Sequence, residues 1–330
     1  MESSNSSSPP KLVILIPVYN DWPAVITLIE QIENVLSSTG TKVDILLIDD
    51  YSTNKIPDTI VGTHISSVSE INIIHLRRNF GHQRAIAIGL TYQFKKQQCD
   101  GVIVMDGDGE DNPEDIPNLI NHWIKTDQNK VVFAARKKRM EGLSFKFFYR
   151  CYQIIHRILT GHSVRIGNFS IIPSKYLSPL VVSSELWNHY AASVYKLRIP
   201  FDMIKVKRGK RFSGKSKMNF IDLVIHGLSA ISVFGEIVGT RILIFASIIN
   251  LLLIVTLTIV FLIKFTTDLA IPGWATYTSG LLLVMLIQIL STSASFLFFV
   301  LNNRNASSFL PLRDYSLFIK KIKRVYCANE

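Results

Sequence analysis

The sequence of 330 residues contains little cysteine. Its three cysteines, Cys99, Cys151 and Cys327, are far apart and form no Cys-x-x-Cys pair, so the spacing indicates neither a disulfide framework nor a zinc site. We interpret them as reduced thiols of a cytoplasmic compartment. Residues 1–10 also lack the apolar stretch of a signal peptide, and we expect them to be a disordered tail.

Basic residues outnumber acidic ones, and the net charge is +11. Such a charge suits nucleic acid, an anionic membrane surface or an anionic substrate. No nucleic-acid-binding motif is present, so we expect no nucleic-acid partner. Much of the positive charge instead flanks two long apolar runs, at residues 242–263 and 277–301.

These two runs predict a transmembrane hairpin over residues 241–304. Each run is long enough for the roughly 20 helical residues that cross a bilayer. Lysines and arginines precede the first run and follow the second, whereas residues 265–276 between them have none. By the positive-inside rule, we expect a multi-pass protein of the cytoplasmic membrane with both termini in the cytoplasm and a basic tail at residues 305–330.

Neither run contains a charged residue, which disfavours a transporter. Asn250 and Gln288 are expected to join helices within the hairpin or between copies of the chain, which is compatible with a homo-oligomer.

The first half alternates short apolar runs with helical patterns. Continuous apolar strands of this kind are typical of a parallel sheet with both faces covered, and thus of an α/β domain. The predicted strands are residues 12–18, 43–49, 71–76, 101–106 and 131–135. No Gly-x-Gly-x-x-Gly fingerprint follows the first strand, and we expect no Walker Gly-Lys-Ser/Thr loop, so we expect neither of the usual dinucleotide and ATP cradles.

Polar residues follow each predicted strand, most densely after the fourth. There, six of ten residues are acidic: Asp106, Asp108, Glu110, Asp111, Glu114 and Asp115. Because parallel strands end at one edge of a sheet, we expect these polar loops to form one ligand site. Asp106 and Asp108 suit a divalent cation that carries a diphosphate, with arginines adding charge-assisted bonds. An EF-hand is disfavoured, because Asp111 stands where the turn glycine belongs; a plain acidic loop remains the alternative.

Four stretches in order carry a family resemblance over residues 11–240: IPVYND, LLIDDYS, LRRNFGHQRAIAIGL and VMDGDGEDNPE. They resemble the family 2 glycosyltransferases of GT-A fold, and more narrowly the dolichol-phosphate mannose synthase and bacterial polyprenyl-phosphate glycosyltransferase branch. The resemblance implies a Rossmann-like, mostly parallel catalytic domain at residues 11–217. It implies inverting transfer from a UDP- or GDP-sugar to a polyprenyl phosphate with Mg²⁺ or Mn²⁺, in the biosynthesis of a cell-envelope glycan.

The resemblance also implies roles for individual residues. The catalytic residues would be Asp108, Arg211 and Lys217, and the metal ligands Asp106, Asp108 and Glu110. The nucleotide-sugar would contact Pro17, Tyr19, Asp21, Asp49, Asp50, Asp106, Arg136 and Ser216, with Arg208 nearby. No Gln-x-x-Arg-Trp segment is present, which disfavours a processive polysaccharide synthase.

One position departs from the family pattern. Many members have Gly-Asp-Phe-Arg where this chain has Gly167-Asn168-Phe169-Ser170. Asn168 cannot act as a base; a lipid phosphate acceptor, already an anion, needs little proton removal, whereas a hydroxyl acceptor needs a base. Glu185 and His189 are the candidates for that base. The departure therefore leaves open a second function, sugar transfer to a hydroxyl of a saccharide or another membrane-associated acceptor.

Two further segments indicate a bilayer partner. Residues 145–161 and 219–236, the latter within a juxtamembrane segment at 218–240, have the pattern of amphipathic helices beside basic residues. Core-packing helices are the alternative, mainly for the second segment. A non-catalytic membrane scaffold that keeps the nucleotide fold is a third possible function, against which the retained Asp106, Asp108, Arg211 and Lys217 argue.

Overall fold

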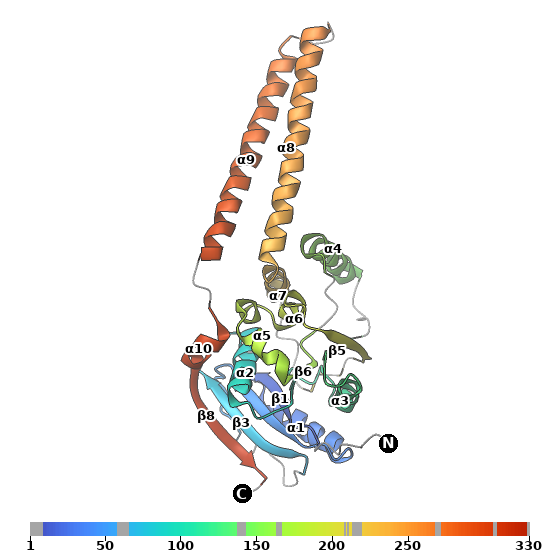
Figure 1. Ribbon diagram of the computed structural model, residues 1–330, viewed down its shortest axis with the longest axis vertical. Coiled ribbons are helices and arrows are strands. Elements are labelled where there is room, and N and C mark those ends of the chain that lie inside the picture. The colour runs from blue at the N-terminus through green and yellow to red at the C-terminus, as the bar shows by residue number, and fades with distance from the viewer. Residues whose placement is uncertain are drawn as a thin grey trace, which may run out of the picture. The chain divides into compact units, whose positions relative to one another are not determined.

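The computed structural model describes residues 9–57, 66–136, 143–162, 167–207, 209, 211–212, 220–267, 272–305 and 309–328. The chain forms two compact units. The first comprises Met1–Leu143, Val164–Val233 and Ser308–Glu330, and the second comprises Ser144–Ser163 and Phe234–Ser307. The sheet belongs to the first unit and the two longest helices belong to the second (Figure 1).

The first unit is built on a mostly parallel sheet of eight strands within the described residues, as expected for the α/β domain. The strands lie in the order β7-β5-β6-β4-β1-β2-β3-β8. Only β6 and β8 run antiparallel to the strands beside them. Their bounds are β1 Leu12–Val18, β2 Val43–Asp49, β3 Val68–Leu76, β4 Gly101–Val104, β5 Val131–Arg136, β6 Ser170–Pro173, β7 Phe201–Val206 and β8 Ile319–Cys327. The five strands predicted from the sequence are therefore confirmed.

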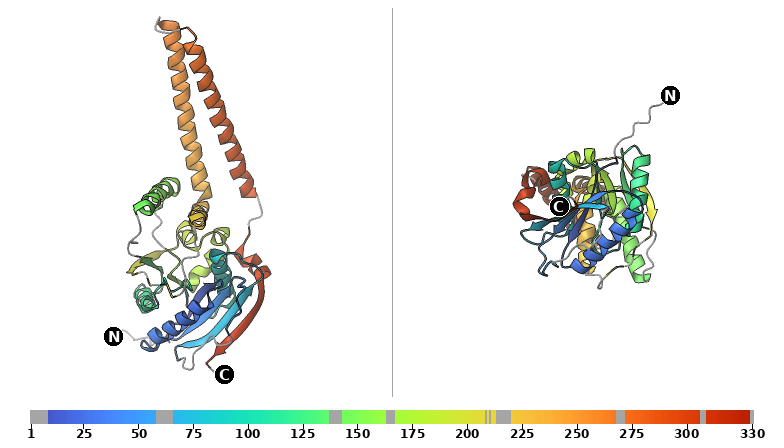
Figure 2. Two further views of the ribbon diagram at one scale, coloured as in Figure 1. Left: turned by 180° about the vertical axis from the view of Figure 1, so that it is seen from behind. Right: turned by 90° about the horizontal axis from the view of Figure 1, so that it is seen from below.

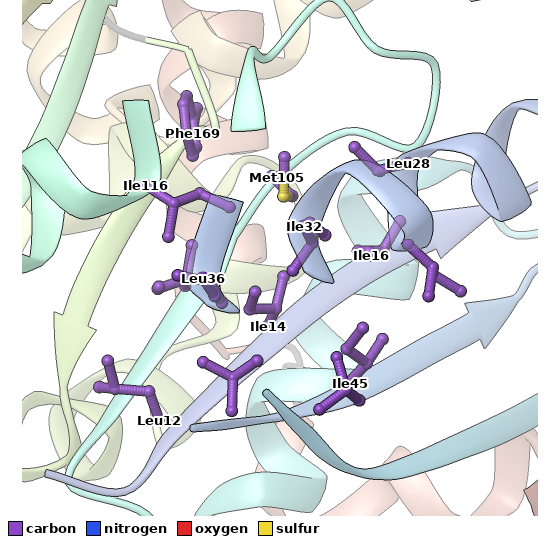
Figure 3. Close-up of a cluster of buried hydrophobic side chains, with 14 of the residues drawn as sticks. Leu12, Ile14, Ile16, Leu28, Ile32, Leu36, Ile45, Met105, Ile116 and Phe169 are labelled. Carbon is purple, nitrogen blue, oxygen red and sulfur yellow. The ribbon is translucent and has the colours of Figure 1, made fainter. Parts of the chain in front are cut away.

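Helices cover both faces of this sheet, which explains why its central strands read as unbroken apolar runs. Along β1, Leu12, Ile14 and Ile16 pack with α1 (Trp22–Ser37) and α3 (Ile116–Lys125) (Figure 3). The intervening Val13 and Leu15 pack with helices of the opposite face. These helices are α2 (His82–Lys96), α5 (Leu177–Val181) and α6 (Tyr190–Lys196). Figure 2 shows α1 lying along the strands on its own face.

The sequence analysis did not predict several shorter elements. They are β6 and β7, the 3-10 helices η1 (Pro113–Asp115), η2 (Ser174–Tyr176) and η3 (Ser184–Trp187), and α10 (Pro311–Phe318) with β8. The last two lie in the segment described from the sequence as a basic tail. β8 pairs antiparallel with β3 along most of its length, so this part of the tail forms the edge strand of the sheet beside β3.

The second unit contains α4 (Leu143–Thr160), α8 (Gly235–Thr266) and α9 (Trp274–Asn305). By length and composition, α8 and residues Trp274–Phe298 of α9 are able to cross a membrane, and 18-residue stretches within them have mean hydropathies of 2.7 and 2.1. They form a hairpin (Figure 1), in which a Cβ at Gly239 would lie 3.2 Å from Val300. The Nη1 atom of Arg241 donates to the Ile158 carbonyl at 2.6 Å, which ties α8 to α4. The helix α7 (Phe220–Ser232), within the predicted amphipathic segment, belongs to the first unit.

Candidate active site

The parallel strands bring the predicted polar loops to one edge of the sheet. Val18 pairs with Asp49 across β1 and β2, and Leu15 pairs with Val104 across β1 and β4. The loops after these strands therefore begin side by side. Pro17 lies in β1 and Tyr19 directly follows it, with 45% of its surface exposed.

Asp49 ends β2 and is held as a buried carboxylate. Its Oδ2 atom lies 2.8 Å from His75 Nδ1, and its Oδ1 accepts the Ser52 N–H at 3.0 Å. Burial alone would raise the pKa of Asp49, but the hydrogen bonds from His75 and Ser52 outweigh it and hold the pKa below its ordinary value. The sequence analysis missed His75, although a polar residue inside the apolar run of β3 was a signal for it.

Asp50, the next residue, makes its hydrogen bonds to the loop after β3. It is 2% exposed, and its two oxygens accept the N–H groups of Phe80 at 2.7 Å and Gly81 at 2.8 Å. Burial raises the pKa of Asp50 to about 6, against the effect of those hydrogen bonds. Asp50 thus fixes the loop that follows β3, and both of its oxygens are engaged within the protein.

The loops after β1 and β2 are tied together by Asn20. Its Oδ1 accepts the N–H groups of Thr53 at 2.8 Å and Asn54 at 3.0 Å, and its own N–H donates to Ser52 Oγ at 2.9 Å. Asn20 has a left-handed backbone with φ of 52°, as does the exposed Tyr51 with φ of 65°. Asp21 lies between this loop and α1.

Two carboxylates fold the acidic loop after β4 back on itself. The 2% exposed Asp111 accepts the Asp106 N–H at 2.9 Å, and Asp108 Oδ1 accepts the Glu110 N–H at 2.9 Å. Gly109 has φ of +85°, and a Cβ there would lie 2.5 Å from the ring of Phe212. Only glycine fits this turn without displacing Phe212.

Arg211 supplies the positive partner of this loop, from 103 residues further along the chain. Its Nη2 donates to Asp108 Oδ2 at 2.7 Å. Backbone hydrogen bonds join the same two segments. The Gly209 N–H donates to the Glu110 carbonyl at 2.9 Å, and the Phe212 N–H donates to the Asp108 carbonyl at 3.1 Å. Arg211 Nε and Nη1 are buried and have no hydrogen-bond partner within the part of the chain that the structure describes. These N–H groups suit phosphate oxygens.

The residues present fit a divalent metal only together with a phosphorylated ligand. No group of three or more His, Cys, Asp or Glu side chains in the described segments is arranged to hold a metal ion. Asp106, Asp108 and Glu110 therefore form no protein-only cage. Mg²⁺ is commonly bound by one or two carboxylates plus substrate phosphates, and a carboxylate oxygen that accepts one hydrogen bond keeps a second lone pair. This donor set matches Asp106 and Asp108.

The expectation that the chain has no Walker loop is wrong at the level of spacing, because residues 209–216 read Gly-Lys-Arg-Phe-Ser-Gly-Lys-Ser. The described part of this segment, however, is bound to the acidic loop through Gly209 and Arg211. Arg208, Ser216 and Lys217 lie outside the described residues. Arg136 ends β5.

Comparison with known proteins identifies the family. The model described as "Glycosyl transferase family 2" matches residues 13–178, which include all of β1 except Leu12 and the whole of β2 to β6. The chain belongs to this family. It is a glycosyltransferase, and the loops after β1, β2 and β4 lie within the matched region.

Individual relatives are distant. An uncharacterized glycosyltransferase, YkcC, of Bacillus subtilis is 25% identical over 83% of this chain and 85% of its own length. The undecaprenyl-phosphate 4-deoxy-4-formamido-L-arabinose transferase of Salmonella typhimurium is 28% identical over 65% of this chain and 64% of its own length. Among solved structures, mannosyl-3-phosphoglycerate synthase from Rubrobacter xylanophilus has a TM-score of 0.48 and 14% identity, covering 69% of this chain and 73% of that one.

The position at which the chain departs from the family pattern is buried in a hydrogen-bond network. Asn168 is 8% exposed, and its Oδ1 accepts Gln83 Nε2 at 2.9 Å. Gln83 in turn accepts the Tyr190 N–H at 2.8 Å. In register, Asn168 lies just beyond the last pair of β4 and β6, Val104 with Ser170. It is therefore near Asp106 but presents no basic group.

The two candidate bases are also engaged in the fold. Glu185 accepts hydrogen bonds from Lys196 and Ser183. Burial alone would raise the pKa of Glu185, but these hydrogen bonds outweigh it and hold the pKa below its ordinary value. His189 is 5% exposed and caps α6, where its Nδ1 accepts the Ala192 N–H at 3.3 Å. Neither side chain is an unoccupied base.

Proposed function

We propose that this glycosyltransferase moves a sugar, with inversion, from a UDP- or GDP-sugar to a polyprenyl phosphate in the membrane. The observation that carries the donor half of the proposal is the contact between Arg211 and Asp108. It places against the acidic loop a guanidinium whose Nε and Nη1 atoms are buried and have no hydrogen-bond partner among the described residues. A diphosphate is the ligand that uses both features at once.

At the donor end, Asp49 and the exposed Tyr19 would contact the nucleoside, while Asp50 holds the neighbouring loop. Asp106 and Asp108 would hold Mg²⁺ or Mn²⁺, which supplies charge stabilisation for the departing diphosphate when bound. Arg211 would donate to the phosphate oxygens as negative charge develops on them. Stabilisation of this kind is commonly the largest catalytic contribution. Lys217, Ser216 and Arg136 remain candidates for further phosphate contacts.

At the acceptor end, a lipid phosphate suits the side chains better than a hydroxyl. An acceptor that is already an anion needs no base. Asn168 cannot serve as one, and Glu185 and His189 are both committed to contacts within the fold. The printed name of the Salmonella relative gives undecaprenyl phosphate as its acceptor, which supports the same choice.

The membrane half of the proposal depends on α8, α9 and α4. The first two would cross the cytoplasmic membrane with both chain ends on the cytoplasmic side. On α4, Ile154, Ile155 and Ile158 are all more than half exposed, which suits burial at the lipid headgroup boundary. Asn250, buried at 8% exposure on α8, is a candidate for helix contacts within or between chains.

A transfer assay tests the function directly. The purified full-length protein in detergent is given polyprenyl phosphate, Mg²⁺ or Mn²⁺ and labelled UDP- and GDP-sugars, and products are extracted into organic solvent. We expect label in the lipid phase with one donor, lost in Asp108→Asn. Glu114→Gln is the matched control, because Glu114 is an exposed carboxylate of the same acidic run and should retain transfer.

Other outcomes are equally decisive. Metal-dependent hydrolysis of a donor without lipid label would favour a hydroxyl acceptor and overturn the lipid phosphate. Equal loss in Asp108→Asn and Glu114→Gln would argue against a specific role for Asp108. Neither binding nor transfer with any donor would contradict the proposed donor class.

A further inference from the structure

The chain that follows the hairpin returns to the loop after β3. We define the C-terminal segment as residues 309–327, which contain α10 and β8. β8 pairs with β3, with Ile319 opposite Leu76. The next residue of the loop, Arg77, donates its N–H to the Phe318 carbonyl at 2.9 Å. The segment is thus attached where β3 ends and the loop begins.

Side chains reinforce this attachment through an aromatic cluster of Phe80, Trp187, Phe309 and Phe318. The Phe80 and Phe318 rings meet edge to face with centroids 4.8 Å apart. Trp187 lies 5.1 Å from Phe318 and 4.0 Å from Phe309. Such aromatic pairs stabilise a fold beyond the effect of the apolar area that they bury. Two rings of this cluster come from the C-terminal segment.

Two arginines pack on the rings of this cluster. The Arg78 guanidinium lies 4.6 Å from the centre of the Phe80 ring, and that of Arg84 lies 5.3 Å from the Trp187 ring. Phe80 is therefore in contact with both Phe318 and Arg78. Its backbone N–H, with that of Gly81, is what Asp50 accepts.

We propose that the C-terminal segment is a positioning element of the donor site. Phe318 packs against Phe80. The backbone N–H groups of Phe80 and Gly81 donate to Asp50, and Asp50 in turn positions the end of β2 beside Asp49. The segment touches none of the reacting atoms and acts through the loop after β3. The inference rests on the proposed function, in which the end of β2 binds the nucleoside of the donor.

Binding measurements on full-length protein in detergent test this role. Calorimetry gives the Kd for UDP and GDP, and the transfer assay gives the KM for polyprenyl phosphate. In Phe318→Ala we expect the nucleoside diphosphate to bind about tenfold more weakly, equivalent to about 1.4 kcal/mol, with the acceptor KM unchanged. Phe318→Tyr keeps the ring and should restore binding. Phe318→Leu keeps much of the volume without the ring, and it decides the question if Phe318→Ala does not fold.

Phe201→Ala is the matched control. Phe201 packs against Tyr195 at 4.5 Å and Phe133 at 6.1 Å, on β7 at the opposite end of the strand order. The Phe201→Ala substitution removes a comparable ring and leaves the loop after β3 unchanged, so nucleotide binding should persist. Equal weakening in both alanine variants, or an unchanged Kd in folded Phe318 variants, would overturn the positioning role. If the wild type binds neither UDP nor GDP, the proposed donor class fails, and this inference with it.

Discussion

Two neighbouring carboxylates at the end of β2 meet opposite electrostatic conditions. Asp49 has a pKa below its ordinary value because the hydrogen bonds from His75 and Ser52 outweigh the effect of burial. Asp50 has a pKa raised to about 6 because burial outweighs the two backbone N–H groups it accepts. At neutral pH, Asp49 is therefore ionised at little cost, whereas Asp50 is ionised against its surroundings.

This contrast predicts how stability depends on pH. Between the unfolded pKa of about 4 and the folded pKa of about 6, Asp50 holds its proton in the native state but releases it in the unfolded state. The free energy of unfolding should therefore fall as pH rises through this window. Relative to Asp50→Asn, which cannot titrate, the wild type should lose up to roughly 3 kcal/mol between pH 4 and pH 7. Denaturation followed by tryptophan fluorescence measures this difference, and a constant difference would contradict the pKa.

Loss of Arg211 should lower the catalytic efficiency of sugar transfer. Arg211→Ala removes the donors proposed for the diphosphate and leaves Asp108 without its cation, so kcat/KM for the donor should fall about 10²–10³-fold. Arg211→Lys keeps the charge but not the planar fork, and an intermediate value is expected. Lys125→Ala, an exposed cation on α3, is the control for net charge. An unchanged kcat/KM in Arg211→Ala would exclude this role.

At the scale of elements, burial decides what the sequence could predict. β1 and β2 are covered on both faces, so their apolar runs predict them directly. β8 has basic residues at Lys320, Lys321 and Lys323, and it forms a strand because β3 offers an open edge. That edge is a long-range property of the fold, which a pattern of neighbouring residues does not contain. The same limit applies to the contact between Arg211 and Asp108. The sequence predicted a site role for each of the two loops, but it did not predict the ion pair between them.

The close fit of these two loops predicts different costs for two glycines with similar backbones. Gly109 and Gly40 have φ of +85° and +68°, so alanine is strained by roughly 1–2 kcal/mol at either position. Only at Gly109 would the added Cβ also meet a ring, that of Phe212 at 2.5 Å, while at Gly40 nothing lies within 4 Å. Gly109→Ala should therefore lose transfer activity and Gly40→Ala should retain it. Thermal unfolding and the transfer assay measured together test this, and equal activity would contradict the crowding.

At the scale of the whole molecule, the same chain carries a polar sheet edge and a hairpin of α8 and α9. A helix of 32 residues, the length of α8 and of α9, rises about 48 Å, more than the roughly 30 Å of a hydrocarbon core. The excess leaves room for the ends of both helices to reach the headgroup region. The sequence contained this information locally, because length and hydropathy alone indicate a spanning helix.

The orientation of the hairpin is the last prediction, and cysteine labelling tests it. Because basic residues flank its outer ends, Thr267 at the end of α8 should lie outside the cytoplasm and Cys327 at the end of β8 inside it. In a variant without native cysteines, Thr267→Cys should react with an impermeant maleimide from the outside of intact spheroplasts. A variant that retains only Cys327 should react in inverted vesicles alone. Labelling of both positions from the same side would show that α8 and α9 do not form the proposed spanning pair, and exchange of the two patterns would reverse the orientation.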